Sequence, residues 1–285
     1  MRLSQVVTDW AVDPFLLVAV LAAAGAYLEG VRRSRRRWPA ARSAAFLGGL
    51  AVLLVASQSG IDAWSERLLS IHMVQHLLIT MVAALLLTAG APLTLALSTL
   101  PRGGRAALAR LLHGRLAACL GHPLVAWSLF AAVLLLSHVP AVYGAALRSP
   151  SLHALEHGLY LWAALLFWAP VVAADPLPRR LSTVGVVGYL LAAMAPMSAI
   201  GAALLMADQV AYGHYAATAA AAGVSPLDDQ RAGAAIMWIG GGLVMVLATL
   251  GGAWLAMLRE ERRARAREAY EDARGARPAV WGGAR

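Results

Sequence analysis

The chain has 285 residues, of which 60% are hydrophobic and only 14% are charged, and its mean hydropathy is +0.66. This composition is too apolar for an ordinary soluble domain, so we expect an integral membrane protein. All 24 basic residues are arginine, and the absence of lysine excludes a retinal-type Schiff base. The single cysteine, Cys119, excludes an internal disulfide and every paired-cysteine metal motif.

Seven apolar runs are long enough to cross about 30 Å of hydrocarbon as helices. They lie near residues 14–31, 43–60, 71–98, 123–147, 152–174, 182–206 and 232–257. We therefore predict an all-α polytopic membrane protein, a seven-helix transmembrane bundle over residues 1–258 with a charged cytoplasmic tail over residues 259–285. No small-residue cleavage site precedes the first run, so we expect no cleaved signal peptide.

Arginine is distributed unevenly between the two sets of alternate loops. One set carries 20 of the 24 arginines and the other set carries 4. The positive-inside rule then places the N-terminus outside and the C-terminus in the cytoplasm. The net charge of +9 is explained by these short loops, so we expect the lipid bilayer and not a nucleic acid as the partner of the arginines.

Three places interrupt the simple helical pattern. The Gly-Ala-Pro sequence at 90–92 should bend or end the third helix, and Pro140 should bend or end the fourth. The longest external connection is predicted over residues 207–231.

The arginine and alanine usage is typical of a GC-rich bacterial genome, so we expect a multi-pass protein of a bacterial plasma membrane.

Five of the eight histidines fall at the outer end of predicted helices. His72 and His76 open the third helix, His153 and His157 open the fifth, and His138 ends the fourth. Histidines four residues apart share one helix face. Because a histidine inside a membrane is costly and usually faces the bundle interior, five at one depth indicate a bound metal or another polar centre. We therefore expect the two pairs to lie close together near the outer face, which requires the third and fifth helices to be neighbours.

Several chemistries fit this pattern. Imidazole suits copper and zinc, and methionine favours copper(I); Met73 adjoins the first pair and Met197 lies in the sixth helix. The alternatives are a hydrogen-bonded contact between helices, a b-type haem held by two helices, and a zinc peptidase in which Glu156 of the HALEH sequence is the general base. We assign no role to His113 and His122, and we interpret His214 as a surface residue in preference to an entry ligand.

Four segments resemble the multi-spanning CtaG family of cytochrome c oxidase assembly proteins. They are HMVQHLLITMVAALLLTAGAPL at 72–93, SHVPAVYGAAL at 137–147, LHALEHGLYLWAALLFW at 152–168 and SPLDDQRAGAAIMWIGGG at 225–242. The resemblance runs from about the second helix to the seventh, in the family's order and spacing. It implies a seven-helix membrane protein of the respiratory chain, without catalytic turnover, that helps to build a haem-copper oxidase.

The resemblance further implies copper as the cofactor and a metallochaperone role on the outer side of the membrane. The expected partners are cytochrome c oxidase subunits and periplasmic copper chaperones. Carried over by motif, the expected metal ligands are His72, His76, His138, His153 and His157. Candidates for orienting these ligands or for gating are Gln75, Glu156, Asp229 and Gln230, although Asp229 and Gln230 could equally cap the seventh helix.

Overall fold

A computed structural model describes residue 10 and residues 12–176 and 179–275, and in these residues it contains helices and no strands. Six helical segments are long and apolar enough to cross a membrane, and a bent pair makes a seventh if it is one span. The all-α, polytopic prediction is therefore confirmed. The segments are Pro14–Arg33, Ala40–Gln58, Leu69–Thr99, Pro123–Ser137 with Pro140–Arg148, Pro150–Val172, Thr183–Leu205 and Pro226–Trp254.

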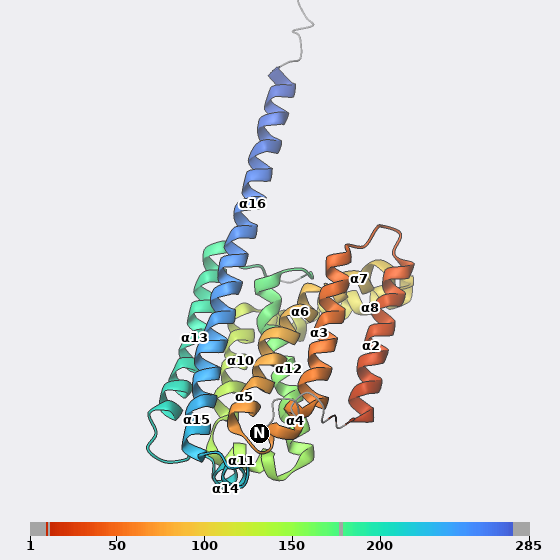
Figure 1. The fold of residues 1–285 in the computed structure, drawn as a ribbon. Helices are drawn as coiled ribbons and strands as arrows, with labels where there is room; N and C mark the ends of the chain where they lie inside the picture. Colours follow the sequence, from red (N-terminus) through yellow and green to blue (C-terminus); the bar gives the residue numbers. More distant parts are fainter. Residues whose placement is uncertain (1–9, 11, 177–178, 276–285) are drawn as a thin grey trace, which may run out of the picture.

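The elements follow one another in the order drawn in Figure 1. The first part of the chain forms α2 (Pro14–Arg33), α3 (Ala40–Gln58), α4 (Gly60–Ser65), α5 (Leu69–Leu77), the π-helix η1 (Leu78–Ala83), α6 (Ala84–Ala89), α7 (Pro92–Thr99), α8 (Arg102–Leu112) and α9 (Arg115–Leu120). The second part forms α10 (Pro123–Ser137), α11 (Pro140–Arg148), α12 (Pro150–Val172), α13 (Thr183–Leu205), α14 (Gly213–Ala221), α15 (Pro226–Ala235), the π-helix η2 (Ile236–Gly240) and α16 (Gly241–Gly275).

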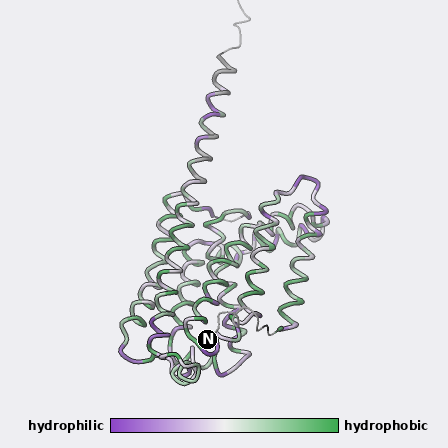
Figure 2. Tube along the Cα trace, viewed as in Figure 1, coloured by the Kyte–Doolittle hydropathy of each residue, from purple (hydrophilic) through white to green (hydrophobic). Residues whose placement is uncertain are grey.

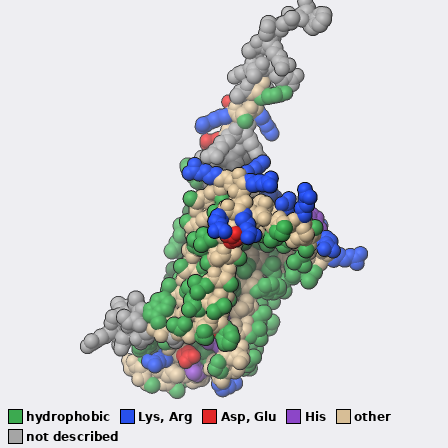
Figure 3. Space-filling model, turned by 90° about the vertical axis from the view of Figure 1, so that its right-hand side faces the viewer, with side chains coloured by type: hydrophobic (Ala, Val, Ile, Leu, Met, Phe, Trp, Pro, Cys, Tyr) green, Lys and Arg blue, Asp and Glu red, His purple; other side chains and the backbone are tan. Residues whose placement is uncertain are grey.

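The two ends of the bundle differ in composition. The short helices α4, α11 and α14 lie at the lower end in Figure 1, whereas α7, α8 and the extension of α16 lie at the upper end. The helices between the two ends are largely hydrophobic (Figure 2), and the basic side chains gather at the upper end (Figure 3). We call the lower end the histidine end and the upper end the arginine end.

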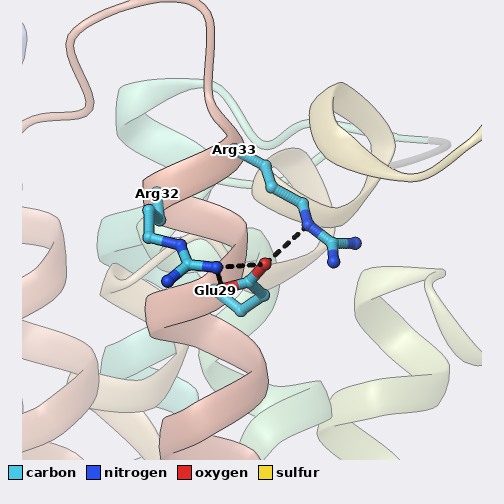
Figure 4. Close-up of polar contacts among 3 residues, drawn as sticks. All are labelled: Glu29, Arg32 and Arg33. Carbon is cyan, nitrogen blue, oxygen red and sulfur yellow. Dashed lines mark hydrogen bonds and ion pairs between the residues drawn. The ribbon is translucent and has the colours of Figure 1, made fainter.

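Ion pairs stabilise the last turn of α2 at the arginine end. Glu29 lies 3.0 Å from Arg32 and 2.7 Å from Arg33, one helical turn along the same face (Figure 4). The two arginines also lie where the negative end of the helix dipole favours cations. These pairs are exposed, so their contribution to the free energy of folding is small.

The third membrane segment breaks where the sequence predicts it. Ala91 adopts a left-handed backbone conformation with φ of 52°, and Pro92 begins α7. The freed carbonyl of Gly90 accepts a hydrogen bond of 2.8 Å from the Tyr27 hydroxyl. A side chain at Gly90 would meet Phe46 at 2.6 Å, so glycine allows α3 to approach the break.

The fourth membrane segment is sharply bent. α10 and α11 meet at an angle of 77°, with His138 at the C-terminal cap of α10 and Pro140 at the first position of α11. Proline cannot continue the preceding helix but is well suited to begin a new one. The predicted effect of Pro140 is confirmed, and the bend leaves His138 at the histidine end.

The seventh segment begins earlier than expected. α15 starts at Pro226, with Ser225 as its N-cap, so the predicted loop over 207–231 is wrong at its C-terminal end. The same stretch also holds α14. Hydropathy misses this first turn because it is polar, although serine followed by proline is a good helix start.

α16 continues through the predicted domain boundary after position 258. It extends as one helix to Gly275, beyond the bundle in Figure 1. Arg265 and Glu261 pair at 3.6 Å on its surface. The last ten residues of the predicted tail, 276–285, lie outside the described residues.

The third and fifth segments are neighbours at the centre of the bundle. η1 and α6 pack against α12, and α5 packs against α4 and α15. The buried side chain of Trp168 in α12 donates a hydrogen bond of 2.8 Å from its indole nitrogen to the carbonyl of Thr80 in η1. This packing brings the first turns of α5 and α12, which carry the histidine pairs, to the same end.

Candidate metal centre

The histidines of α5 and α12 form one cluster. Ring centroids are 4.1 Å apart between His72 and His76 and 4.3 Å apart between His153 and His157. Between the helices, His72 lies 5.5 Å from His153 and His76 lies 5.6 Å from His157. The predicted proximity of the two pairs is confirmed, and it arises because both pairs occupy facing sides of adjacent helices.

A buried tyrosine determines which ring nitrogen of His72 carries the proton. The Tyr215 hydroxyl donates to the Ser65 carbonyl at 2.7 Å and lies 3.0 Å from Nδ1 of His72. Because a hydroxyl has a single proton, Nδ1 of His72 must carry hydrogen and donate to Tyr215. Nε2 of His72 then has the free lone pair that a metal ligand requires.

His138 is oriented in the same way by the backbone. Its Nδ1 lies 2.8 Å from the Leu134 carbonyl, one turn earlier in α10, and therefore carries the hydrogen. Ser137 lies 3.2 Å from the same nitrogen and is hydrogen-bonded to the Tyr160 hydroxyl. Nε2 of His138 is thus left with its lone pair, as in His72.

Unpartnered polar atoms are concentrated in this cluster. Buried polar side-chain atoms nearly always have hydrogen-bond partners, so a group without them indicates a ligand or ordered solvent. Within the described residues, six buried ring nitrogens of five histidines have no protein partner. These atoms are Nε2 of His72, His138, His153 and His157, together with Nδ1 and Nε2 of His76.

One carboxylate lies beside the imidazoles. Glu156 projects from α12, its Oε1 is buried without a partner, and its ligand atom lies within 4.8 Å of one atom each of His72 and His76. Two imidazoles and a carboxylate are a donor set that suits copper or zinc. The residues therefore fit a bound metal ion at this position.

The geometry of the cluster differs from that of a zinc peptidase and of a haem site. In an HxxEH peptidase the glutamate works beside the two histidines of its own helix, whereas Glu156 groups with His72 and His76 of α5. A haem needs a broad space between two imidazoles. Here the rings of Tyr160 and His76 lie 4.4 Å apart and those of Tyr143 and His72 lie 5.2 Å apart, so aromatic side chains pack directly on the imidazoles.

Three of the predicted orienting residues bind elsewhere. Gln75 donates to Asp62 at 2.6 Å and to the Ala56 carbonyl at 3.0 Å. Gln230 accepts from the backbone of Ala211 at 2.7 Å and donates to the carbonyls of Leu204, in α13, and Gln209. Among the described residues, their hydrogen bonds connect helices and loops around the cluster and do not reach an imidazole.

Asp229 caps a helix, but a different one from that expected. Its carboxylate accepts from the backbone nitrogen of Leu69 at 2.6 Å and of Ser70 at 3.3 Å, at the N-terminus of α5. Its own helix is capped by Ser225. A carboxylate at a helix N-terminus satisfies free backbone donors and complements the helix dipole, so Asp229 positions the helix that carries His72 and His76.

Sequence reasoning missed the tyrosines around the cluster. Tyr143, Tyr160, Tyr212 and Tyr215 are all buried, and the Tyr212 hydroxyl donates to the His138 carbonyl at 3.1 Å. Tyr160 lies one turn after His157 on α12, a spacing that could have signalled its place. No comparable spacing connects Tyr215, in α14, with His72.

A cavity of about 480 Å³ opens beside the cluster at the histidine end. His153 and His157 line it together with three carboxylates, those of Asp13, Asp62 and Glu66. Within the described residues none of the three pairs with an arginine within 4.0 Å. Burial raises the pKa of Asp62, the hydrogen bond from Gln75 offsets part of this rise, and the neighbouring carboxylates of Glu66 and Asp13 add to it. This wall carries negative charge that would attract a cation.

The remaining histidines lie outside the cluster. Nδ1 of His113 contacts the Ala109 carbonyl at 2.7 Å, and His122 caps α10 by accepting from the backbone of Leu124 at 3.3 Å. His214 is held at 2.8 Å by the Glu66 carbonyl. Each therefore has a structural partner away from the clustered imidazoles.

The chain is similar to proteins of known family. The model of the cytochrome c oxidase caa3 assembly factor family (Caa3_CtaG) matches residues 25–259. Uncharacterized proteins of Mycobacterium bovis and Mycobacterium tuberculosis are each 32% identical over 279 residues, and one of Mycobacterium leprae is 27% identical over 283 residues. Each alignment covers 93% of this chain.

The chain spans less than half the length of these relatives, 42% of the first two and 43% of the third. No solved structure matches. The family model covers most of the chain, from within the first membrane segment onward, and includes His72, His76, His138, His153 and His157. The chain therefore belongs to the Caa3_CtaG family of cytochrome c oxidase assembly factors.

Proposed function

We propose that this protein binds copper at the histidine end of its bundle and delivers it to a copper centre of a cytochrome c oxidase. The single observation that carries the proposal is the group of unpartnered imidazole nitrogens of His72, His76, His153 and His157 beside Glu156. The family is one of oxidase assembly factors, and copper is the metal of such oxidases that imidazoles bind well.

The proposed orientation places this cluster on the outer side. The arginine end faces the cytoplasm under the positive-inside rule, so the N-terminus and the histidine end face outward and all seven segments cross the membrane. The cavity lined by Asp13, Asp62 and Glu66 then opens to the periplasmic side. A cation would enter there, pass His153 and His157, and reach the deeper pair in α5.

The protein's own residues would hold and release the ion without catalytic turnover. Nε2 of His72 is presented by the hydrogen bond between Nδ1 and Tyr215. Glu156 supplies a negative charge that offsets part of the cost of a cation in the membrane interior. The expected partners are a periplasmic copper donor and an oxidase subunit in the same plasma membrane.

A deletion strain tests this function. Oxidase polypeptides should be made but oxidase activity should be low, and added copper should restore part of it. Wild-type chain should restore activity fully, whereas a His72→Ala/His76→Ala variant present at equal membrane level should not. A His113→Ala/His122→Ala variant, which changes two histidines of the arginine end, is the control. Normal oxidase activity and copper content in the deletion strain would refute the proposal.

A further inference from the structure

A second, smaller cavity lies deeper than the cluster. Its volume is about 20 Å³, enough for one atom-sized guest, since a single water needs about 10–15 Å³ by this measure. Two histidines, His76 and His138, line it from α5 and from the α10–α11 bend. Four methionines, whose thioether sulfurs are soft ligands, also line the cavity: Met73, Met81, Met197 and Met237.

The two imidazoles offer lone pairs that no protein group uses. His76 is 6% exposed and His138 is 8% exposed, and the ring nitrogens identified above as unpartnered include Nε2 of both. The bond from Nδ1 of His138 to the Leu134 carbonyl leaves its Nε2 unprotonated. Two buried bases without donors therefore line a space that fits one ion.

The methionines reach this space from different parts of the bundle. Met73 and Met81 come from the third segment, Met197 from α13 and Met237 from η2, and each is at most 4% exposed. Buried methionine usually serves only to fill gaps. Here four of the nine methionines line the same small cavity as two unpartnered imidazoles, which packing alone does not require.

Backbone features make room for these side chains. A side chain at Gly241 would collide with the terminal methyl of Met197, so the glycine is needed for that rotamer. His76 and Met81 lie on either side of the start of η1, and Met237 lies in η2. Single π-helical turns are frequent at functional sites because they shift side chains out of the regular helical register.

We propose that this inner cavity is a copper(I) site, with His76 and His138 and two or more of the four methionine thioethers as ligands. Within the described lining the donors are neutral, since it contains no carboxylate. A monovalent ion is less costly than a divalent ion to bury among neutral groups, and thioether sulfur selects copper(I). The inference rests on the proposed function and adds to it the oxidation state and the thioether ligands.

His76 connects this inner site with the outer group of His72 and Glu156. It belongs to both sets of lining residues, and its two ring nitrogens are both unpartnered. Copper(I) entering at the imidazole cluster can therefore pass to the thioether site through a rotation of one side chain. No change of oxidation state is needed.

The test uses the full chain, purified in detergent and loaded with copper(I) under reducing conditions against a competing copper(I) chelator. A variant with Met73→Leu, Met81→Leu, Met197→Leu and Met237→Leu removes all four thioethers of the lining while keeping similar volume. A Met245→Leu/Met194→Leu variant is the control, because these methionines pack in the same core as Met81 and Met197 but do not line the cavity. X-ray absorption at the copper edge reports copper–sulfur scattering directly.

We expect sulfur scattering in the wild type and in the control, and its loss in the variant that lacks all four lining methionines. Even outer partners of metal ligands change affinity by about 10- to 100-fold, so copper(I) affinity should fall by at least about tenfold. Zinc retention should be the same in all three proteins. Copper bound through nitrogen and oxygen alone, or equal affinities in the two variants, would overturn the inner site but leave the proposed function intact. Absence of copper binding in the wild type would overturn both.

Discussion

At the scale of single residues, the sequence identifies the imidazoles but not what orients them. His72, His76, His153 and His157 are found by their spacing, which fixes the helix face without knowledge of the fold. Tyr215 lies 143 positions from His72, and only the packing of α14 over residues 65–67, just before α5, brings them to 3.0 Å. Long-range contacts of this kind leave no periodic trace in one sequence.

The Tyr215→Phe variant tests this orientation. Removal of the hydroxyl leaves Nδ1 of His72 without its acceptor, so metal affinity should fall by about tenfold. The folding free energy should fall by about 2 kcal/mol for the two lost hydrogen bonds, to Ser65 and from His72. Both are measurable, by metal titration and by thermal melting of the purified protein.

Tyr189→Phe is the matched control, because that buried hydroxyl donates to the Phe167 carbonyl at 3.1 Å away from the histidines. It should lower stability by about 1 kcal/mol, for one lost hydrogen bond, without changing metal affinity. Equal metal affinity in Tyr215→Phe and wild type would contradict the role of Tyr215.

At the scale of helices, hydropathy and proline positions predict the segments, the break at Gly90–Pro92 and the bend before Pro140. They do not predict which helix a buried aspartate caps. Asp229 binds the start of α5, and Asp175 binds the start of α7 through the backbone nitrogens of Leu93 and Thr94. Both carboxylates come from distant parts of the chain, because tertiary packing and not local sequence brings them to these helix ends.

These two aspartates make a paired test. Asp229→Asn and Asp175→Asn should each cost about 1 kcal/mol of folding free energy, since each weakens an N-terminal cap. Only Asp229→Asn should also weaken metal binding, because α5 carries His72 and His76 whereas α7 carries no histidine. A loss of metal affinity in both variants, or in Asp175→Asn alone, would contradict the positioning role of Asp229.

At the scale of the whole molecule, the number of arginines in each set of alternate loops predicts which loops share the basic end of the bundle. Alternate loops collect at opposite ends of the bundle, so the side rich in arginine and the side rich in histidine are both predictable from sequence. That the helices carrying the two histidine pairs are neighbours follows from the sequence only if the two pairs share one site. Its detailed packing, with Trp168 bonded to η1, depends on side-chain shapes that the sequence pattern does not encode.

Cys119, the single cysteine, offers a direct test of orientation. It is exposed in α9 at the arginine end, so a membrane-impermeant maleimide should label it only after cells are permeabilised. In a Cys119→Ser background, a cysteine introduced by Ala217→Cys in the exposed face of α14 should instead be labelled in intact cells. The reverse pattern would show that the histidine end faces the cytoplasm.

The measurement that tests the copper centre most directly is the metal content of the purified chain after copper loading and removal of loose ions. The account predicts stoichiometric copper in the wild type and in the His113→Ala/His122→Ala control. The His72→Ala/His76→Ala variant should remain folded by circular dichroism yet retain little copper. A wild type that retains no copper, or a folded His72→Ala/His76→Ala variant that retains as much as the wild type, would contradict the account.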